Sequence, residues 1–133
     1  MINFGIVANV VGVLLVVIGG FMLTALPFSL YFGGSDALPL FQAALITTAV
    51  GTGLYWGNFR AKKHIGKREG YLIVALGWFG VSFVSTLPYL LSGVFPDISN
   101  AIFESVSGLT TTGASVLRDI ESAPKGILFW RSM

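Results

Sequence analysis

The 133-residue chain contains no cysteine, a single histidine, and charged residues at only 11% of its positions. The lack of cysteine excludes disulfide bonds and thiolate metal sites. The one histidine, His64, lies in a basic stretch, where we expect a solvated loop residue rather than a metal ligand or a catalytic base. Soluble domains carry about 25% charged residues, so the shortage of charge argues against a soluble protein.

Hydrophobic residues instead make up 54% of the chain. Three stretches carry no charged residue at all: 1–35, 37–59 and 70–96. Each is longer than the roughly 20 residues that an α-helix needs to cross the hydrocarbon core of a bilayer. The sequence therefore predicts an all-α membrane protein with transmembrane helices at 4–31, 38–59 and 71–91. The first stretch has no basic start and is too long for a signal peptide, so we expect a retained helix.

Small residues recur at helical spacing on the first two predicted helices, which indicates close helix contacts. They are Ala8 with Gly12, Gly19 with Gly20, and the series Ala49, Gly53 and Gly57. The glycines of the first helix are explained equally well as ordinary residues of a membrane helix.

Prolines and caps predict where the helices begin and end. Pro27 is expected to kink or end the first helix, and Pro88 to bend or stop the third. Asp36 is expected to cap the second helix, and Asp97 or Ser99 the short helix that follows the third.

Five of the eight basic residues fall in the connector 60–69. The positive-inside rule places this short connector, and with it the amino terminus, in the cytoplasm. The run either only fixes the topology or also contacts anionic lipid or a cytosolic partner. Because the basic residues are gathered there, the net charge of +2 does not indicate nucleic acid. We expect three parts: two helices at 1–59, the connector at 60–69, and a helix–loop–helix repeat at 70–133.

The segment 100–109 predicts a helix too short to span the membrane. We interpret it as a re-entrant pore helix, followed by irregular backbone at 110–115 and by a return to the outer surface at 116–123. Irregular backbone at membrane depth is tolerated only inside protein or beside a water-filled cavity. The apolar run after Pro124 predicts the start of a fourth transmembrane helix.

The polar run 105–116 contains three consecutive threonines and a glycine between apolar neighbours. A short helix aims the partial negative charge of its carboxyl end at the membrane centre, and loop carbonyls replace water around a cation. The loop has no carboxylate, which favours a monovalent ion over a divalent one. Glu104 on the short helix either bonds backbone or a basic partner near the loop, or tunes ion affinity through its charge.

Residues 103–116 resemble the first pore loop of the TrkH/KtrB potassium-uptake proteins of the Trk/Ktr/HKT superfamily. The stretches 69–74, 85–89 and 127–132 match as well, so the resemblance covers the whole chain. It implies one chain with four such repeats around a central pore and, in TrkH-type members, two extra helices in front. The implied K⁺-coordinating residues, acting mainly through backbone carbonyls, are Thr110, Thr111, Thr112, Gly113 and Ala114.

The resemblance also implies the ion, the partners and the location. Glycine at position 113 accompanies potassium preference, whereas serine there accompanies sodium preference in some plant relatives. Such proteins form homodimers, bind a cytosolic nucleotide-binding subunit, lie in the plasma (inner) membrane and need no cofactor besides the K⁺ they carry. Family members continue for three more repeats, so we expect this chain to be a fragment that is inactive alone.

Two other functions compete with this interpretation. The Gly113–Ser115 run is loosely similar to the nucleophile motif of rhomboid proteases, but a serine nucleophile needs a base within hydrogen-bond reach. His64 is predicted on the cytoplasmic side, so we do not expect an enzyme. A small non-transporting membrane protein that binds other helices through Gly53 and Gly57 is the second alternative.

Overall fold

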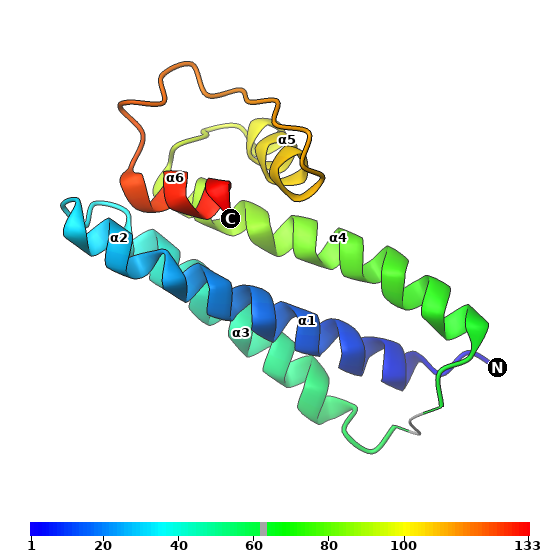
Figure 1. The fold of residues 1–133 in the computed structure, drawn as a ribbon. Coiled ribbons are helices and arrows are strands. Elements are labelled where there is room, and N and C mark those ends of the chain that lie inside the picture. The colour runs from blue at the N-terminus through cyan, green and yellow to red at the C-terminus, as the bar shows by residue number, and fades with distance from the viewer. Residues whose placement is uncertain (62–63) are drawn as a thin grey trace.

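The computed structural model describes residues 1–61 and 64–133. Lys62 and Lys63 of the predicted basic connector lie outside the described residues. Within the described ranges every regular element is an α-helix, as predicted (Figure 1). The helices are α1 (Phe4–Thr24), α2 (Leu26–Tyr31), α3 (Ala37–Gly57), α4 (Lys67–Ser92), α5 (Ile98–Leu109) and α6 (Lys125–Ser132).

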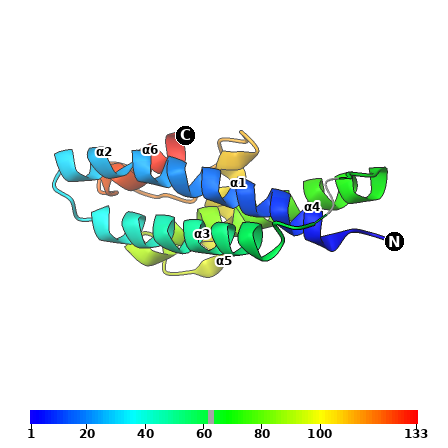
Figure 2. The same ribbon diagram turned by 90° about the horizontal axis from the view of Figure 1, so that it is seen from below.

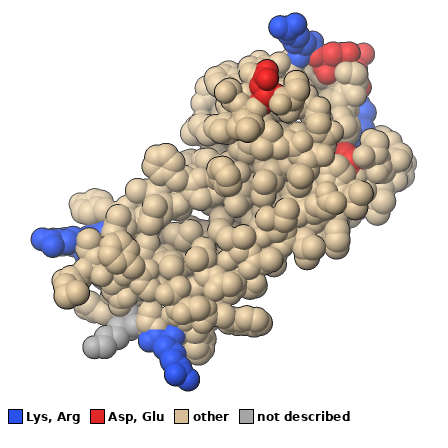
Figure 3. All heavy atoms as spheres, turned by 180° about the vertical axis from the view of Figure 1, so that it is seen from behind, with Lys and Arg blue, Asp and Glu red and all other residues tan. Residues whose placement is uncertain are grey.

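Three segments of the described chain are long and apolar enough to cross a membrane: Phe4–Tyr31, Ala37–Gly57 and Lys67–Ser92. They correspond to the three predicted spans. The shortest has 21 residues and would measure about 32 Å as an ideal helix, enough for a hydrocarbon core of about 30 Å. On the face shown in Figure 3, charged side chains gather toward the two ends of the elongated molecule and leave an uncharged surface between them.

The two prolines act differently. Pro27 lies in the first turn of α2, directly after the break at Ala25 that separates α2 from α1, as expected. Pro88 does not end the third helix, because α4 continues to Ser92 and stops at Gly93, whose φ of 71° is left-handed. A left-handed glycine is a common helix terminator, and here it overrides the proline signal.

Helix α1 packs mainly against α3, and the two run side by side in both ribbon views (Figure 2). A Cβ atom added to Gly12 would lie 2.7 Å from the carbonyl oxygen of Gly51, and one added to Gly51 would lie 2.7 Å from that of Gly12. The predicted packing role of Gly12 is therefore confirmed. Glycine at both positions lets the two backbones approach closely.

The predicted stripe on the second helix does not pack against another described helix. Ala49 is exposed, and added Cβ atoms on Gly53 and Gly57 would meet nothing within 4 Å. The face that meets α1 carries Gly51 instead. Helix α3 carries a second series of small residues at helical spacing, Ala44, Thr47 and Gly51, and these are the buried ones. Spacing alone does not show which of the two series faces the neighbouring helix.

Replacing Gly51 with valine is expected to destabilise the chain by about 1–3 kcal/mol, the usual cost of overpacking a close contact. The matched control is Gly53→Val, two residues away on the same helix with open space around it. Thermal unfolding in detergent measures both. Equal losses for the two variants would show that the effect comes from helix propensity and not from the α1–α3 contact.

Helix α5, α6 and the loop between them gather beside the carboxyl-terminal half of α4 (Figure 1). Helix α5 packs mainly on α4, and α6 mainly on α2. A buried cluster joins these parts through Ala25, Leu40, Tyr89, Phe95, Ala101 and Ile127. With 12 residues, α5 is about 18 Å long, too short to cross a membrane.

Candidate functional site

The predicted coordinating residues directly follow the carboxyl end of α5 in residues 110–116, which we call the threonine loop. Thr111 has a φ of 55° and Gly113 a φ of 76°. Left-handed backbone is uncommon for non-glycine residues and rarer still for β-branched ones, so the loop is held in a strained shape at Thr111. A Cβ added to Gly113 would meet nothing within 4 Å. Glycine is therefore favoured at 113 by the backbone angle, not by lack of space.

The backbone amides of the loop turn back onto α5. Those of Thr110, Thr111 and Thr112 donate to the carbonyls of Val106, Gly108 and Ser107, at 2.9, 3.1 and 3.0 Å respectively. In contrast, no described residue donates a hydrogen bond to the carbonyls of residues 110–113. The Ala114 carbonyl accepts one hydrogen bond, from the Ser107 hydroxyl at 2.6 Å, so one lone pair of this oxygen remains available. The site thus offers a run of exposed oxygens beside the negative end of a helix dipole.

The threonine side chains differ in how they are used. The Thr110 hydroxyl donates to the Val106 carbonyl at 2.7 Å and lies 2.8 Å from that of Thr112. The Thr111 hydroxyl makes no hydrogen bond with the described residues. It lines a small hollow of about 180 Å³ together with Gly108, Gly113 and Arg131 among others.

Glu104 connects three elements behind the loop. Its side chain is 1% exposed, and its carboxylate accepts from the Ser115 hydroxyl at 2.9 Å and from the Val116 amide at 3.0 Å. Arg131 of α6 completes the arrangement by an ion pair with the same carboxylate. Glu104 therefore bonds both loop backbone and a basic partner, which are the contacts expected of its structural role.

The sequence reasoning missed Arg131 and two buried serines. The signal for Arg131 was its position: it is the one charged residue in the apolar run after Lys125, and a charge in such a run needs a partner. Ser107 holds the Ala114 carbonyl, and Ser105 donates to the Ser82 carbonyl at 3.0 Å, which fixes α5 on α4. Small polar residues on a membrane helix often make such contacts.

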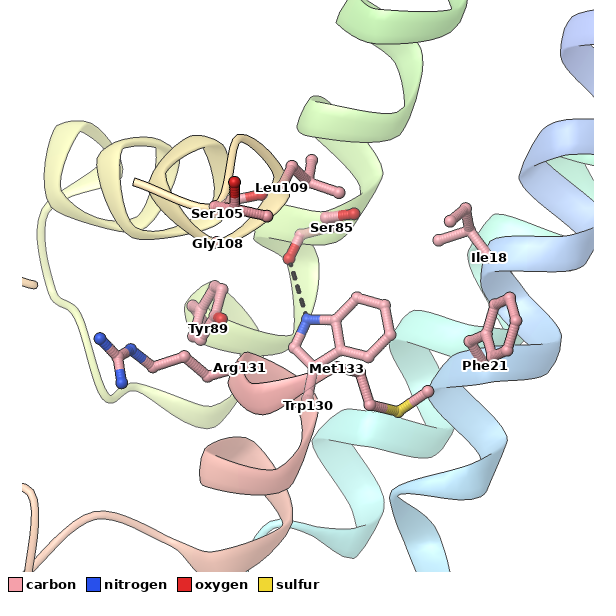
Figure 4. Close-up of a pocket in the computed structure, with 11 residues that line it drawn as sticks. Ile18, Phe21, Ser85, Tyr89, Ser105, Gly108, Leu109, Trp130, Arg131 and Met133 are labelled. Atoms are coloured by element: carbon pink, nitrogen blue, oxygen red, sulfur yellow. Dashed lines mark hydrogen bonds between the residues drawn. The ribbon is translucent and has the colours of Figure 1, made fainter. Parts of the chain in front are cut away.

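A cavity of about 290 Å³ lies behind the loop, between α1, α4, α5 and α6 (Figure 4). Trp130 of α6 projects into it and donates its indole N–H to the Ser85 carbonyl at 3.3 Å. Ile18 and Phe21 of α1 close the opposite side. Helix α1 thus reaches the elements that carry the threonine loop.

Ser115 is the candidate nucleophile of the protease alternative. Its hydroxyl donates a hydrogen bond to the Glu104 carboxylate and accepts one from the Leu117 amide at 3.1 Å. His64 is exposed in the connector before α4. Ser115 therefore connects the threonine loop to Glu104 by hydrogen bonds in this structure.

Three apolar helices of membrane-spanning length, followed by a short helix and an oxygen-rich loop, define a polytopic helical membrane protein. Residues 38–133 match the sequence model of the TrkH family, described as cation transport protein. The chain belongs to the TrkH family.

Solved and curated relatives agree with this assignment. The chain is 37% identical to the Trk system potassium uptake protein TrkH of Salmonella typhimurium and 36% identical to that of Escherichia coli K12, in both cases over 98% of this chain and 27% of the relative. The crystal structure of the potassium transporter TrkH from Vibrio parahaemolyticus superposes with a TM-score of 0.90 at 31% identity, over 98% of this chain and 28% of that one. The chain thus spans about a quarter of the length of these relatives.

Proposed function

We propose that this chain supplies the first of four filter loops of a potassium transporter. The observation that carries the proposal is the run of four carbonyls, at residues 110–113, that accept no hydrogen bond from the described residues on an exposed loop at the end of α5. Such oxygens replace the water around a dehydrated monovalent ion. The relatives are named as potassium uptake proteins, which supports K⁺ as the ion.

The proposed arrangement makes α4, α5 and α6 the first helix–loop–helix repeat, with α5 as a re-entrant pore helix and α6 as the start of the inner helix. The division into 1–59, 60–69 and 70–133 follows from it. The exposed position of Thr110, Thr111, Thr112, Gly113 and Ala114 on this chain supports the proposal, since coordinating atoms must face the pore and not the core.

The remaining repeats, a homodimer and a cytosolic nucleotide-binding subunit are the proposed partners, and the inner membrane with a cytoplasmic amino terminus is the proposed location. These follow from the family and from the basic connector. The alternative of a non-transporting helix-binding protein retains only the exposed glycines Gly53 and Gly57 in its favour. The extent of the family match favours transport.

Ion flux from liposomes that hold the complete transporter containing these residues tests the proposal. Thr111→Val keeps the shape of the side chain and removes a hydroxyl that has no partner among the described residues. We expect the potassium-to-sodium flux ratio to fall about fivefold, the equivalent of one neutral hydrogen bond of about 1 kcal/mol. The control is Thr52→Val on α3, where the hydroxyl bonds its own helix backbone at 2.9 Å. A wild-type ratio for Thr111→Val would show that the Thr111 hydroxyl does not contribute, and wild-type ratios for both Thr111→Val and Gly113→Ser would contradict the filter assignment.

A further inference from the structure

Asp36 lies in the connector between α2 and α3, far from the threonine loop in sequence, and only 2% of it is exposed. It occupies the N-cap position of α3, but its side chain makes no capping hydrogen bond there, so the expected capping role is wrong. The carboxylate instead accepts the Ser29 hydroxyl of α2 and, at 2.7 Å, the backbone amide of Ile127. The Asp36 carboxylate therefore binds an amide that is 91 residues away in sequence and not the nearby amides of α3.

The amide that Asp36 binds lies in the first turn of α6. The first amides of a helix have no partner within the helix, and a carboxylate there is favoured by the helix dipole. Asp36 thus caps α6 from another part of the chain. The start of α6 packs closely against Asp36 and Ser29, since a Cβ on Gly126 would lie 2.6 Å from the Asp36 carboxylate and 2.7 Å from the Ser29 Cβ. The rings of Phe28 and Phe129 stack beside it with centroids 3.9 Å apart.

One helical turn further along α6 stands Arg131, which pairs with Glu104. Glu104 in turn holds Ser115 and the Val116 amide of the threonine loop. The loop is therefore connected to the α2–α3 corner by two carboxylates with one turn of α6 between them. Coupling between distant sites is carried by contiguous hydrogen bonds, ion pairs and rigid helical backbone, and this connection consists of such contacts.

We propose that Asp36 is a positioning residue for the threonine loop, acting through α6, Arg131 and Glu104. The inference rests on the proposed function, because it assigns the helices that precede the repeat a role in supporting the filter. The coupling of Asp36 to the loop can itself be measured without ion flux.

Hydrogen exchange of the full chain in detergent micelles, read by mass spectrometry, tests the coupling. In Asp36→Asn, one of the two accepting oxygens becomes an amide NH2, which cannot accept, and the other becomes a weaker, neutral acceptor. We therefore expect exchange to accelerate about tenfold or more in the peptide that contains Ile127. We also expect faster exchange, by about threefold, in the peptide that contains Val116. The control is Asp97→Asn, which removes an equal charge from an exposed residue at the start of α5 and should alter neither peptide.

The second peptide decides between coupling and a merely local role. Faster exchange at Ile127 alone would show that Asp36 holds only α6 and would overturn the proposal, as would no change at either peptide. If Asp36→Asn does not fold, Ser29→Ala decides, because it keeps the charge and removes the hydroxyl that fixes the carboxylate. It should accelerate both peptides by a smaller factor, and an unchanged Val116 peptide would again overturn the proposal.

Flux measurements separate this inference from the proposed function. In the complete transporter, Asp36→Asn should lower the potassium-to-sodium flux ratio while Asp97→Asn leaves it unchanged. If the wild type shows no potassium preference, the proposed function fails while a positive exchange result still stands. If the wild type is selective and Asp36→Asn is equally selective, the positioning role fails and the proposed function stands.

Discussion

Replacing Gly113 with serine is expected to remove most of the preference for potassium over sodium. Gly113 has a φ of 76°, where an L-amino acid costs about 1–2 kcal/mol relative to right-handed backbone. Relief of that strain rotates the peptide units on either side of residue 113, and these carry two of the proposed coordinating carbonyls. Because 1.4 kcal/mol corresponds to a factor of ten in an equilibrium, we expect the flux ratio to fall about tenfold.

The chain provides a matched control for this variant. Gly93, at the end of α4, has a φ of 71° and also has nothing within 4 Å of an added Cβ. Gly93→Ser imposes the same strain away from the threonine loop, so it should reduce stability to a similar degree and leave the flux ratio unchanged. A similar drop in selectivity for both variants would show that the effect reflects general destabilisation and not the filter.

Local patterns in the sequence were enough to predict the helices. Charge-free stretches gave the three spans, and the break in apolar character at 105–116 gave the short helix and the loop. The same reasoning failed where a residue's partner lies far away in sequence. Asp36 carries a strong capping signal for α3, yet its carboxylate bonds to α6, because a buried amide across the fold competes with a local one.

The same limit applies to the proposed filter. The identity of Thr111 and Gly113 indicates a loop rich in free oxygens, but the support of that loop comes from Arg131, Ser107 and the α2–α3 corner. Periodicity on α3 likewise allowed two contact faces, and only the position of α1 selects Gly51. Sequence patterns thus predict which residues are unusual, and the packing shows what each of them contacts.

The ion pair between Glu104 and Arg131 should be the most costly of the described contacts to break. Removing one partner of a buried pair leaves the other charge unpaired, at a cost of about 3–5 kcal/mol. Arg131 is 27% exposed, which places the expected loss for Glu104→Gln at the lower end, about 3 kcal/mol. Chemical or thermal unfolding of the chain in detergent measures the loss. Glu121→Gln, at an exposed residue in the following segment, is the control and should have no effect.

A double variant separates the two roles considered for Glu104. If Glu104 acts by holding its neighbours, Arg131→Met added to Glu104→Gln should recover part of the lost stability, because the double variant leaves no unpaired charge at this site. The Val116 amide should then regain part of its protection from hydrogen exchange. Ion flux at low potassium concentration should recover together with that protection. If Glu104 instead tunes ion affinity by its charge, the double variant would regain stability while flux at low potassium stayed depressed. The three hydrogen-bonded partners of the carboxylate favour the first outcome, since a group that tunes an ion through space does not require them.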